Sequence, residues 1–353
     1  MSLTKLIHSK RLILQFPGQG SQRLGMCKDL VDHFPLARDL MKTANEALGF
    51  SISNVMFGDN IEMLNNTKYT QPALLVHSVI AYRVLEEAME QPLLEFVDAM
   101  IGHSVGEYSS LVLSGRMTFT DALKLVHARG VAMNAAANLL NDPSSLGMTA
   151  LVRSVSHTLS IEEMDDELFK FQTSVNDICT EVSTLGDTVS IAAFNSPSQV
   201  VLSGNKGKIT EAVKVVKRTF PSVKLAVPLQ VSTAFHSPYM TPAISMLQDV
   251  FSDNIMKQPP TPAPIPMVMN VDASIQVDDL KSMKSKLLAG INNAVLWYPS
   301  VQTLRRRYPS SIFLELGSGN TLTNLLLKNK HMNEGKDVQS ISISTLEDIT
   351  KFK

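Results

Sequence analysis

Three short apolar segments of this chain end at a glycine, and each is followed by a segment with helical spacing: residues 12–16, 96–101 and 312–316. Short apolar runs bounded by turn residues are typical of strands buried on both faces, as in a parallel sheet. Strands that alternate with helices predict an α/β fold. Because ligands in open α/β sheets bind beyond the carboxyl ends of the strands, we expect functional residues in the loops after these segments.

The middle of the chain has a different pattern. Two segments with helical spacing alternate with three predicted strand regions: 161–182 and 209–220 among 148–155, 188–203 and 223–227. This order predicts a small ferredoxin-like α+β subdomain over residues 138–227. It would be inserted into a large α/β-hydrolase-like domain with a parallel sheet, formed by residues 1–137 and 228–353. The proline-rich segment 259–266 predicts a stiff, extended connector inside the large domain.

The composition excludes several classes of protein. Hydrophobic residues make up 44% of the 353 residues and charged residues 18%, which excludes a disordered chain. Lysine and arginine number 32 against 33 acidic residues, so the net charge of -1 gives no support for binding to nucleic acid or a membrane surface. Only two cysteines are present, Cys27 and Cys179, and no two histidines have metal-ligand spacing. We expect an enzyme of a reducing compartment, with no metal and no membrane span.

The loop after the second apolar segment contains the motif G-x-S-x-G, in which Gly102 and Gly106 flank Ser104. Between a strand and a helix, this motif places the serine on a sharp turn with its hydroxyl exposed, as a nucleophile requires. The N-terminus of the following helix offers free N–H groups to a developing oxyanion. The alternative is a glycine-rich turn with an idle serine, but the predicted strand and helix around the motif favour the nucleophile.

A serine nucleophile needs a base, and His236 is the best candidate among the eight histidines. It lies in a turn, two residues before Pro238, where the ring orientation can be fixed as a general base requires. From this pattern alone, an ordinary surface histidine is the commoner interpretation. His103 is adjacent to Ser104, but a neighbour in such a turn normally points elsewhere. No acid is singled out as the residue that would orient the base.

A buried charge is predicted on the helix that covers residues 118–137. The apolar stripe of this helix consists of Ala122, Leu125, Val126, Ala132, Met133 and Ala136. At 3.6 residues per turn, Arg129 falls in the centre of that stripe. A guanidinium on a buried face is costly unless it is paired, so its partner is either a protein carboxylate or an anionic substrate. The planar fork of arginine suits bidentate binding of a carboxylate.

The glycines within residues 18–25 suggest a phosphate-binding loop, but the pattern fails. Met26 and Cys27 stand where the Walker motif needs lysine followed by serine or threonine, and the third glycine of a dinucleotide motif is absent. A glycine turn after the first strand can instead present a backbone N–H to an oxyanion.

Five segments follow one another in the order found in a known enzyme family: FPGQGSQ at 16–22, YTQPAL at 69–74, GHSVGEY at 102–108, NSP at 195–197 and FHS at 235–237. With these segments the chain strongly resembles the malonyl-CoA:acyl carrier protein transacylases, from about residue 11 to about residue 328. The acyltransferase domains of polyketide and fatty-acid synthases look similar. Five motifs in the right order are far more specific than the serine motif alone.

The resemblance implies a ping-pong reaction for fatty-acid synthesis. Ser104 takes malonyl from coenzyme A as an ester, and the thiol of acyl carrier protein then removes it. His236 is the implied base, typically oriented in this family by a backbone carbonyl. The backbone N–H groups of Gln19 and Val105 form the implied oxyanion hole. Arg129 matches the arginine that binds the malonyl carboxylate, and no cofactor is implied because malonyl-CoA is a substrate.

The resemblance also implies a preference for malonyl. Phe235 fits the members in which an aromatic ring crowds the space for an α-methyl group, and Val105 fits them better than the glutamine of many methylmalonyl relatives. Gln71 and Asn195 match family positions near the site.

One departure concerns Gly290, which stands seven residues before Trp297 where relatives commonly carry glutamine. If only the backbone carbonyl orients His236, glycine suffices. The stretch 156–187 also looks longer than in relatives.

The implied partners are acyl carrier protein and malonyl-CoA, and we expect a monomer. Because carrier proteins are acidic, a local basic surface is expected despite the neutral total. Two clusters are candidates: Lys206, Lys208, Lys214, Lys217, Arg218 and Lys224 in one stretch, and Arg305, Arg306 and Arg307 in another. A solvated helix face is an equally good interpretation of either cluster.

The expected location follows from the basic start of the chain. Five basic residues precede the first acid, Asp29: Lys5, Lys10, Arg11, Arg23 and Lys28. Such an acid-poor start resembles an organellar targeting peptide, although a short tail before the first strand explains it equally well. We expect the dissociated fatty-acid system of a mitochondrion, with the bacterial cytoplasm as the alternative.

Three other functions remain open. A serine esterase or thioesterase would use the same Ser104 and His236, but it would not need Arg129 to bind a carboxylate. An acyltransferase of a polyketide pathway would share the whole site. A non-catalytic relative that only binds carrier protein would form no acyl-serine.

Overall fold

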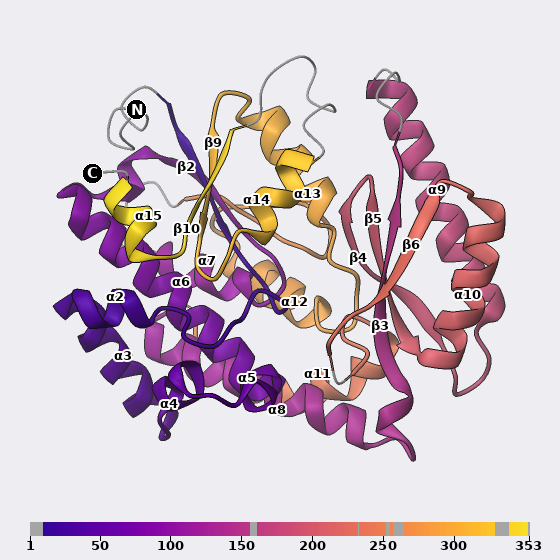
Figure 1. Cartoon of the computed structure of the whole chain (residues 1–353), viewed down its shortest axis with the longest axis horizontal. Helices are drawn as coiled ribbons and strands as arrows, with labels where there is room; N and C mark the ends of the chain where they lie inside the picture. The colour runs from indigo at the N-terminus through magenta and orange to yellow at the C-terminus, as the bar shows by residue number, and fades with distance from the viewer. Residues whose placement is uncertain are drawn as a thin grey trace.

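The computed structural model describes residues 10–155, 161–231, 233–251, 255–256, 265–328 and 339–351. These residues form two sheets, one of six strands and one of four, which lie side by side in Figure 1. Helices alternate with strands along the chain. The expected α/β class with a sheet that contains parallel strands is confirmed.

The large sheet has the order β10-β9-β1-β2-β7-β8. Its strands are β1 (Leu12–Phe16), β2 (Val97–Gly102), β7 (Met267–Val268), β8 (Ile275–Gln276), β9 (Ile312–Leu316) and β10 (Ser340–Ile343). Neighbouring strands are parallel, except that β7 and β8 are antiparallel. The three apolar segments of the sequence form β9, β1 and β2, which are adjacent, and nearly all their side chains are buried.

Helices lie between these strands along the chain and after the last of them. They are α2 (Lys28–His33), α3 (Pro35–Leu48), α4 (Ile52–Phe57), α5 (Ile61–Asn65), α6 (Thr67–Met89), α7 (Gly106–Leu113), α8 (Phe119–Asn138), α11 (Thr241–Leu247), α12 (Leu280–Ala289), α13 (Trp297–Arg307), α14 (Thr321–Lys328) and α15 (Leu346–Lys351), with short 3₁₀ turns η1 (Leu93–Phe96), η2 (Pro143–Ser145) and η3 (Pro238–Met240). Helix α8 begins as predicted, because the Thr118 hydroxyl accepts a hydrogen bond from the backbone N–H of Asp121 at 3.1 Å. Helix α6 packs along α8.

The small sheet is antiparallel, with the order β4-β5-β3-β6. Its elements follow the chain as β3 (Leu146–Arg153), α9 (Ile161–Val182), β4 (Val189–Ser196), β5 (Gln199–Asn205), α10 (Lys206–Thr219) and β6 (Val223–Pro228). Helices α9 and α10 cover one face, around a core that includes Leu151, Phe171 and Leu202. The other face, with Ala150 and Val201, joins the core of the large sheet (Figure 1).

The strands of the large sheet bring three loops to one edge. Strands β1, β2 and β9 are parallel, and Phe16 of β1 lies opposite Gly102 of β2, so their carboxyl ends lie together. A single bridge between Ala193 of β4 and Val295 ties the small sheet to the segment before α13. The loops after β1 and β2 therefore face the inner side of the small sheet.

Several expectations fall outside the described residues. Most of the proline-rich connector, residues 259–264, and the first nine residues are among them. Across the ranges that the structure covers, no helix is long and apolar enough to cross a membrane. The same ranges contain no group of three or more histidine, cysteine or acidic side chains placed to hold a metal ion.

Candidate active site

Ser104 lies on the sharp turn between β2 and α7. Its φ angle is 52°, in the left-handed region that a residue with a Cβ rarely adopts. The two flanking glycines are required by close backbone contacts. A Cβ at Gly102 would collide with the backbone of Gly106, and a Cβ at Gly106 would collide with the carbonyl oxygen of Phe16. The turn therefore packs against β1 and presents the Ser104 hydroxyl at the edge of the sheet.

His236 lies against this hydroxyl. Its Nε2 atom is 2.8 Å from Ser104 Oγ, and its Nδ1 atom is 2.9 Å from the carbonyl oxygen of Gly290 and 3.2 Å from that of Asn293. Because a carbonyl only accepts, the proton of the neutral ring is held on Nδ1 and the lone pair of Nε2 faces the hydroxyl. The orienting group is a backbone carbonyl, so glycine at position 290 does not weaken this contact.

The surroundings of His236 keep its ring neutral. Burial, followed by the charges of Arg129 and His103, lowers the pKa of His236 to about 3. The two carbonyl oxygens on Nδ1 oppose this effect but do not cancel it. A neutral imidazole is the form that can accept the proton of a serine hydroxyl.

The low pKa of His236 predicts a flat pH profile. A base that gains a proton only near pH 3 stays active in mild acid, so kcat/KM for acylation of Ser104 should not fall between about pH 8 and about pH 5. Initial rates of acylation in a series of buffers measure this. An inflection near 6.5, the ordinary pKa of histidine, would contradict it.

Arg129 lies on α8 and is only 4% exposed. One guanidinium nitrogen donates to Gln71 Oε1 at 2.7 Å, and another donates to Ser104 Oγ at 3.2 Å. The buried Nε has no acceptor, and Arg129 forms no ion pair with any carboxylate that the structure describes. The sequence left two possible partners for Arg129, a protein carboxylate and an anionic substrate. The described residues provide no such carboxylate.

Gln71 and Gln19 are linked through one hydroxyl. Gln71 Nε2 donates to Thr67 Oγ1 at 2.9 Å, and that hydroxyl donates to Gln19 Oε1 at 2.9 Å. These two hydrogen bonds hold the loop after β1 against α6. Gln19 and Val105 both line the pocket beside Ser104, and neither backbone N–H has an acceptor among the described residues. Two free N–H groups beside a nucleophile can stabilise an oxyanion.

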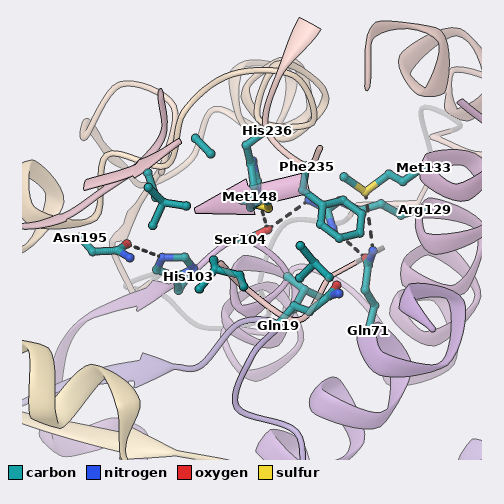
Figure 2. A pocket seen from close by; sticks show the side chains of 16 residues that line it. Gln19, Gln71, His103, Ser104, Arg129, Met133, Met148, Asn195, Phe235 and His236 are labelled. Atoms are coloured by element: carbon teal, nitrogen blue, oxygen red, sulfur yellow. Dashed lines mark hydrogen bonds between the residues drawn. The ribbon is translucent and has the colours of Figure 1, made fainter. Parts of the chain in front are cut away.

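These side chains surround one cavity of about 120 Å³ (Figure 2). All eight site residues expected from the sequence line it: Gln19, Gln71, Ser104, Val105, Arg129, Asn195, Phe235 and His236. Figure 2 shows Ser104 between His236 and Arg129. Both sheets contribute, since Met148 and Val201 of the small sheet complete the apolar wall.

Asn195 lines the cavity, but its side-chain amide is hydrogen-bonded to other protein groups. Its Oδ1 is 2.9 Å from Nε2 of His103, and its Nδ2 donates to Gln199 Oε1 at 2.9 Å. Both ends of the amide therefore have partners within the protein. Asn195 connects the β4–β5 hairpin to the turn that carries the nucleophile, rather than offering a free group to a ligand.

Two residues at this edge were missed by the sequence analysis. Asn270 accepts a hydrogen bond from the backbone N–H of Ser104 at 2.7 Å, and Glu107 accepts one from the backbone N–H of Asn270 at 2.8 Å. A usable signal existed for Asn270, because it follows the apolar residues 267–269 as the site loops follow their strands. For Glu107 the signal was a single acid on a short helix with no other charged residue.

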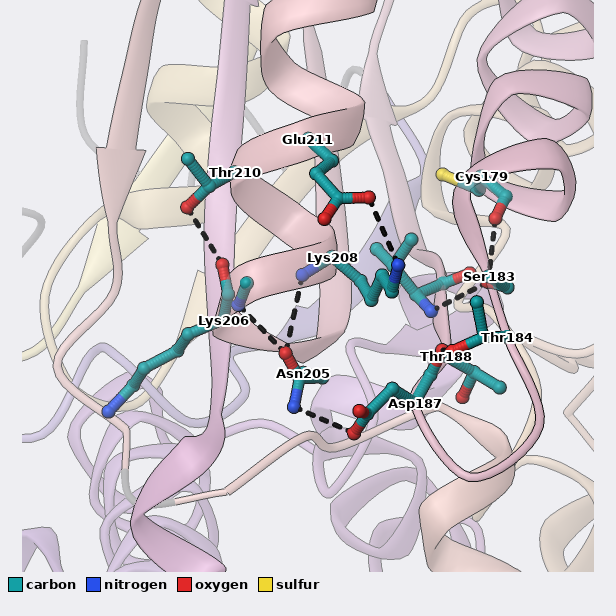
Figure 3. A network of polar contacts seen from close by, with 12 residues as sticks. Cys179, Ser183, Thr184, Asp187, Thr188, Asn205, Lys206, Lys208, Thr210 and Glu211 are labelled. Atoms are coloured by element: carbon teal, nitrogen blue, oxygen red, sulfur yellow. Dashed lines mark hydrogen bonds and ion pairs between the residues drawn. The ribbon is translucent and has the colours of Figure 1, made fainter.

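The two basic clusters lie away from this cavity, and none of their residues lines it. At the start of α10, Lys206 donates to the carbonyl oxygen of Ser144 and Lys208 pairs with Glu211 at 3.1 Å. Figure 3 shows the pair of Lys208 and Glu211 beside Asn205, which caps the helix. Part of the first cluster is thus occupied in holding α10, and a carrier surface there stays a prediction.

Comparisons with known proteins identify the family of this chain. Residues 15–155 match the model of the acyl transferase domain. The malonyl CoA-acyl carrier protein transacylase of Haemophilus influenzae is 33% identical over 344 residues, 97% of either chain, and that of Bacillus subtilis is 33% identical over 318 residues, 90% of either chain. The chain belongs to the malonyl CoA-acyl carrier protein transacylase family.

Solved structures of this family have the same fold. The acyl-carrier-protein S-malonyltransferase of Bartonella henselae superposes with a TM-score of 0.80 at 29% identity, over 97% of this chain and 98% of that one. A type II polyketide malonyl-transacylase, solved in complex with its acyl-carrier protein, superposes with a TM-score of 0.81 at 30% identity, with the same coverage.

The expected mitochondrial location is wrong. The matched transacylases of Haemophilus influenzae, Bacillus subtilis and Staphylococcus aureus are bacterial proteins. Basic residues near the start have structural contacts instead. Arg11 pairs with Asp98 at 2.9 Å, Lys10 donates to Gln339, and Arg23 donates to Ser344. These contacts connect the residues on either side of β1 to β2 and to both ends of β10.

Proposed function

We propose that this chain transfers a malonyl group from coenzyme A to the phosphopantetheine thiol of acyl carrier protein, through a malonyl ester on Ser104, for fatty-acid synthesis. The observation that carries the proposal is the position of Arg129. Its buried guanidinium has no carboxylate partner among the described residues and reaches to 3.2 Å from Ser104 Oγ. A substrate that carries its own carboxylate supplies the missing charge.

In the first half-reaction, Ser104 Oγ attacks the thioester carbonyl while its proton passes to Nε2 of His236. The negative charge that develops on the carbonyl oxygen lies within reach of the N–H groups of Gln19 and Val105. Arg129 holds the malonyl carboxylate. The C–S bond then breaks, and coenzyme A leaves with the proton that His236 held.

In the second half-reaction, the carrier thiol gives its proton to His236 and attacks the ester carbonyl. The C–O bond to Ser104 breaks, and Oγ takes the proton back. The product is a malonyl thioester and the free enzyme. Side chains and backbone N–H groups of the protein supply every catalytic group that the two half-reactions need. We therefore propose no cofactor.

The same cavity supports a preference for malonyl. Phe235 lies in its wall together with Met133 and Val231, and the volume of about 120 Å³ leaves little space beside the acyl group. An α-methyl substituent would therefore meet the Phe235 ring. Malonyl, with no branch, fits beside Arg129.

We assign the architecture as a large α/β-hydrolase-like domain, residues 1–137 and 228–353, with an inserted ferredoxin-like subdomain, residues 138–227. The serine turn between β2 and α7 supports the first assignment. The strand-helix-strand-strand-helix-strand order and the sheet order β4-β5-β3-β6 support the second. We also propose that the chain acts in the cytoplasm, for which the bacterial relatives are the support, and that it is a monomer.

A polyketide pathway is the second candidate for the destination of the malonyl group. The observation that favours it is the likeness to the polyketide malonyl-transacylase at 30% identity. The chemistry at Ser104 is the same in both cases, and only the carrier protein differs.

Intact mass spectrometry tests the proposal. After mixing with malonyl-CoA, the wild-type protein should gain the mass of one malonyl group, and Ser104→Ala should gain none, because Ser104 carries the one hydroxyl, among the described residues, that bonds to His236. Parallel samples with acetyl-CoA and methylmalonyl-CoA should give less adduct. An adduct that persists in Ser104→Ala, or no adduct on the wild type, would contradict the proposal.

A further inference from the structure

The turn that carries Ser104 is held by a side chain from a neighbouring strand. Asn270, which is 2% exposed, lies just beyond β7. Its Oδ1 accepts from the backbone N–H of Ser104 and its Nδ2 donates to the carbonyl of Gly102, each at 2.7 Å. Backbone pairing of β2 with β7 ends at Ile101. The amide of Asn270 therefore continues the hydrogen bonds of the sheet into the turn.

The backbone of Asn270 makes two further contacts. Its N–H donates to Glu107 Oε1 at 2.8 Å, and its carbonyl accepts from the N–H of Leu296 at 2.8 Å. Leu296 ends the segment whose carbonyls, at Gly290 and Asn293, hold Nδ1 of His236. Asn270 thus bonds both to the turn of the nucleophile and to the segment that orients the base.

Glu107 belongs to the GHSVGEY motif but has no part in the transfer steps. It is 5% exposed on α7, and burial raises its pKa to about 8, against the opposing effects of the Asn270 N–H and Arg129. A neutral Glu107 still accepts the hydrogen bond from Asn270. It also leaves the charge of Arg129 uncompensated for a substrate carboxylate.

The backbone conformations of the nucleophile and the base must be held in place by neighbouring residues. Ser104 and His236 both have positive φ angles, 52° and 55°. A residue with a Cβ rarely adopts this region and keeps the conformation only when its surroundings enforce it. We propose that Asn270, held in place by Glu107, is the positioning residue that sets Ser104 Oγ against Nε2 of His236. This inference rests on the proposed function only for the roles of Ser104 as nucleophile and His236 as base.

The test uses a reagent that does not depend on malonyl. Phenylmethanesulfonyl fluoride labels an activated serine: the Oγ–S bond forms, the S–F bond breaks, and the hydroxyl proton passes to His236. Asn270→Ala and Glu107→Leu should each lower the labelling rate by about 100-fold, the cost of a small misplacement of reacting groups. Glu107→Gln should stay within about threefold of wild type, because an amide oxygen accepts the same hydrogen bond.

Glu315 provides the matched control. It is a buried glutamate on β9 whose pKa is raised by burial, and it accepts from the backbone N–H groups of Leu322 at 3.1 Å and Thr323 at 2.8 Å. It does not line the cavity. Glu315→Leu should lower the melting temperature while the folded protein labels at the wild-type rate. A similar loss of labelling in Glu315→Leu and Glu107→Leu would show a merely structural effect and overturn the inference.

Two further readouts separate the outcomes. In the variants that label slowly, kcat for malonyl transfer should fall while KM for malonyl-CoA stays near wild type, since Arg129 is untouched. A folded Asn270→Ala that labels like wild type would overturn the inference. A wild-type protein that labels with the sulfonyl fluoride but not with malonyl-CoA would instead contradict the transferase function and leave the positioning test valid.

Discussion

Replacing His236 with alanine should lower the rate of Ser104 malonylation by roughly 10,000-fold. Nε2 of His236 lies 2.8 Å from Ser104 Oγ, and no other base that the structure describes contacts this hydroxyl. Without the imidazole, the proton of the hydroxyl loses its positioned acceptor, and water is a much weaker base. Rapid mixing with malonyl-CoA followed by intact mass spectrometry measures the rate.

His127 offers the control for this substitution. Its ring packs on Phe50 at 5.2 Å, on the side of α8 away from the cavity. His127→Ala should therefore malonylate at a rate close to wild type. An equal loss in the two variants, or a fast reaction in His236→Ala, would exclude His236 as the base.

The second large effect is expected at Arg129. Arg129→Ala should lower kcat/KM for malonyl-CoA by roughly 100-fold, because the carboxylate of a bound malonyl group would lose a partner worth about 3 kcal/mol. The relative activity with acetyl-CoA should rise, since acetyl has no carboxylate. The measurement is kcat/KM for the two substrates in the same assay.

Arg129→Lys separates charge from shape. A lysine keeps the positive charge but not the fork that bonds Gln71 and Ser104 together. Its kcat/KM for malonyl-CoA should lie between those of Arg129→Ala and wild type. If Arg129→Ala lost malonyl and acetyl transfer to the same extent, Arg129 would serve the structure of the site rather than the substrate.

The parts of the fold that follow from local sequence were predictable. Segments 12–16 and 312–316 coincide with β1 and β9, and segment 161–182 coincides with α9. The burial of Arg129 was predictable from its position in the middle of an apolar stripe, and the structure shows this burial. Its role in binding a substrate carboxylate stays a prediction.

Contacts between distant segments were not predictable. Nothing near Asn270 in the sequence shows that its amide reaches Ser104, 166 residues away, because the contact depends on the parallel pairing of β2 with β7. The hydrogen bond from His236 to the carbonyl oxygen of Gly290 was expected only from the family resemblance, because a backbone carbonyl leaves no mark in the residue type. The basic start was misinterpreted for a similar reason, since Asp98, the partner of Arg11, lies on β2.

The most direct test of the central claim follows the malonyl group from enzyme to carrier. The malonyl-enzyme is prepared, freed of coenzyme A, and mixed with acyl carrier protein that bears its phosphopantetheine thiol; both proteins are then weighed by mass spectrometry. We expect the malonyl mass to leave Ser104 and appear on the carrier, in equal amounts and faster than it is lost to water. Release of free malonate with no gain of mass on the carrier would identify a hydrolase and contradict this account.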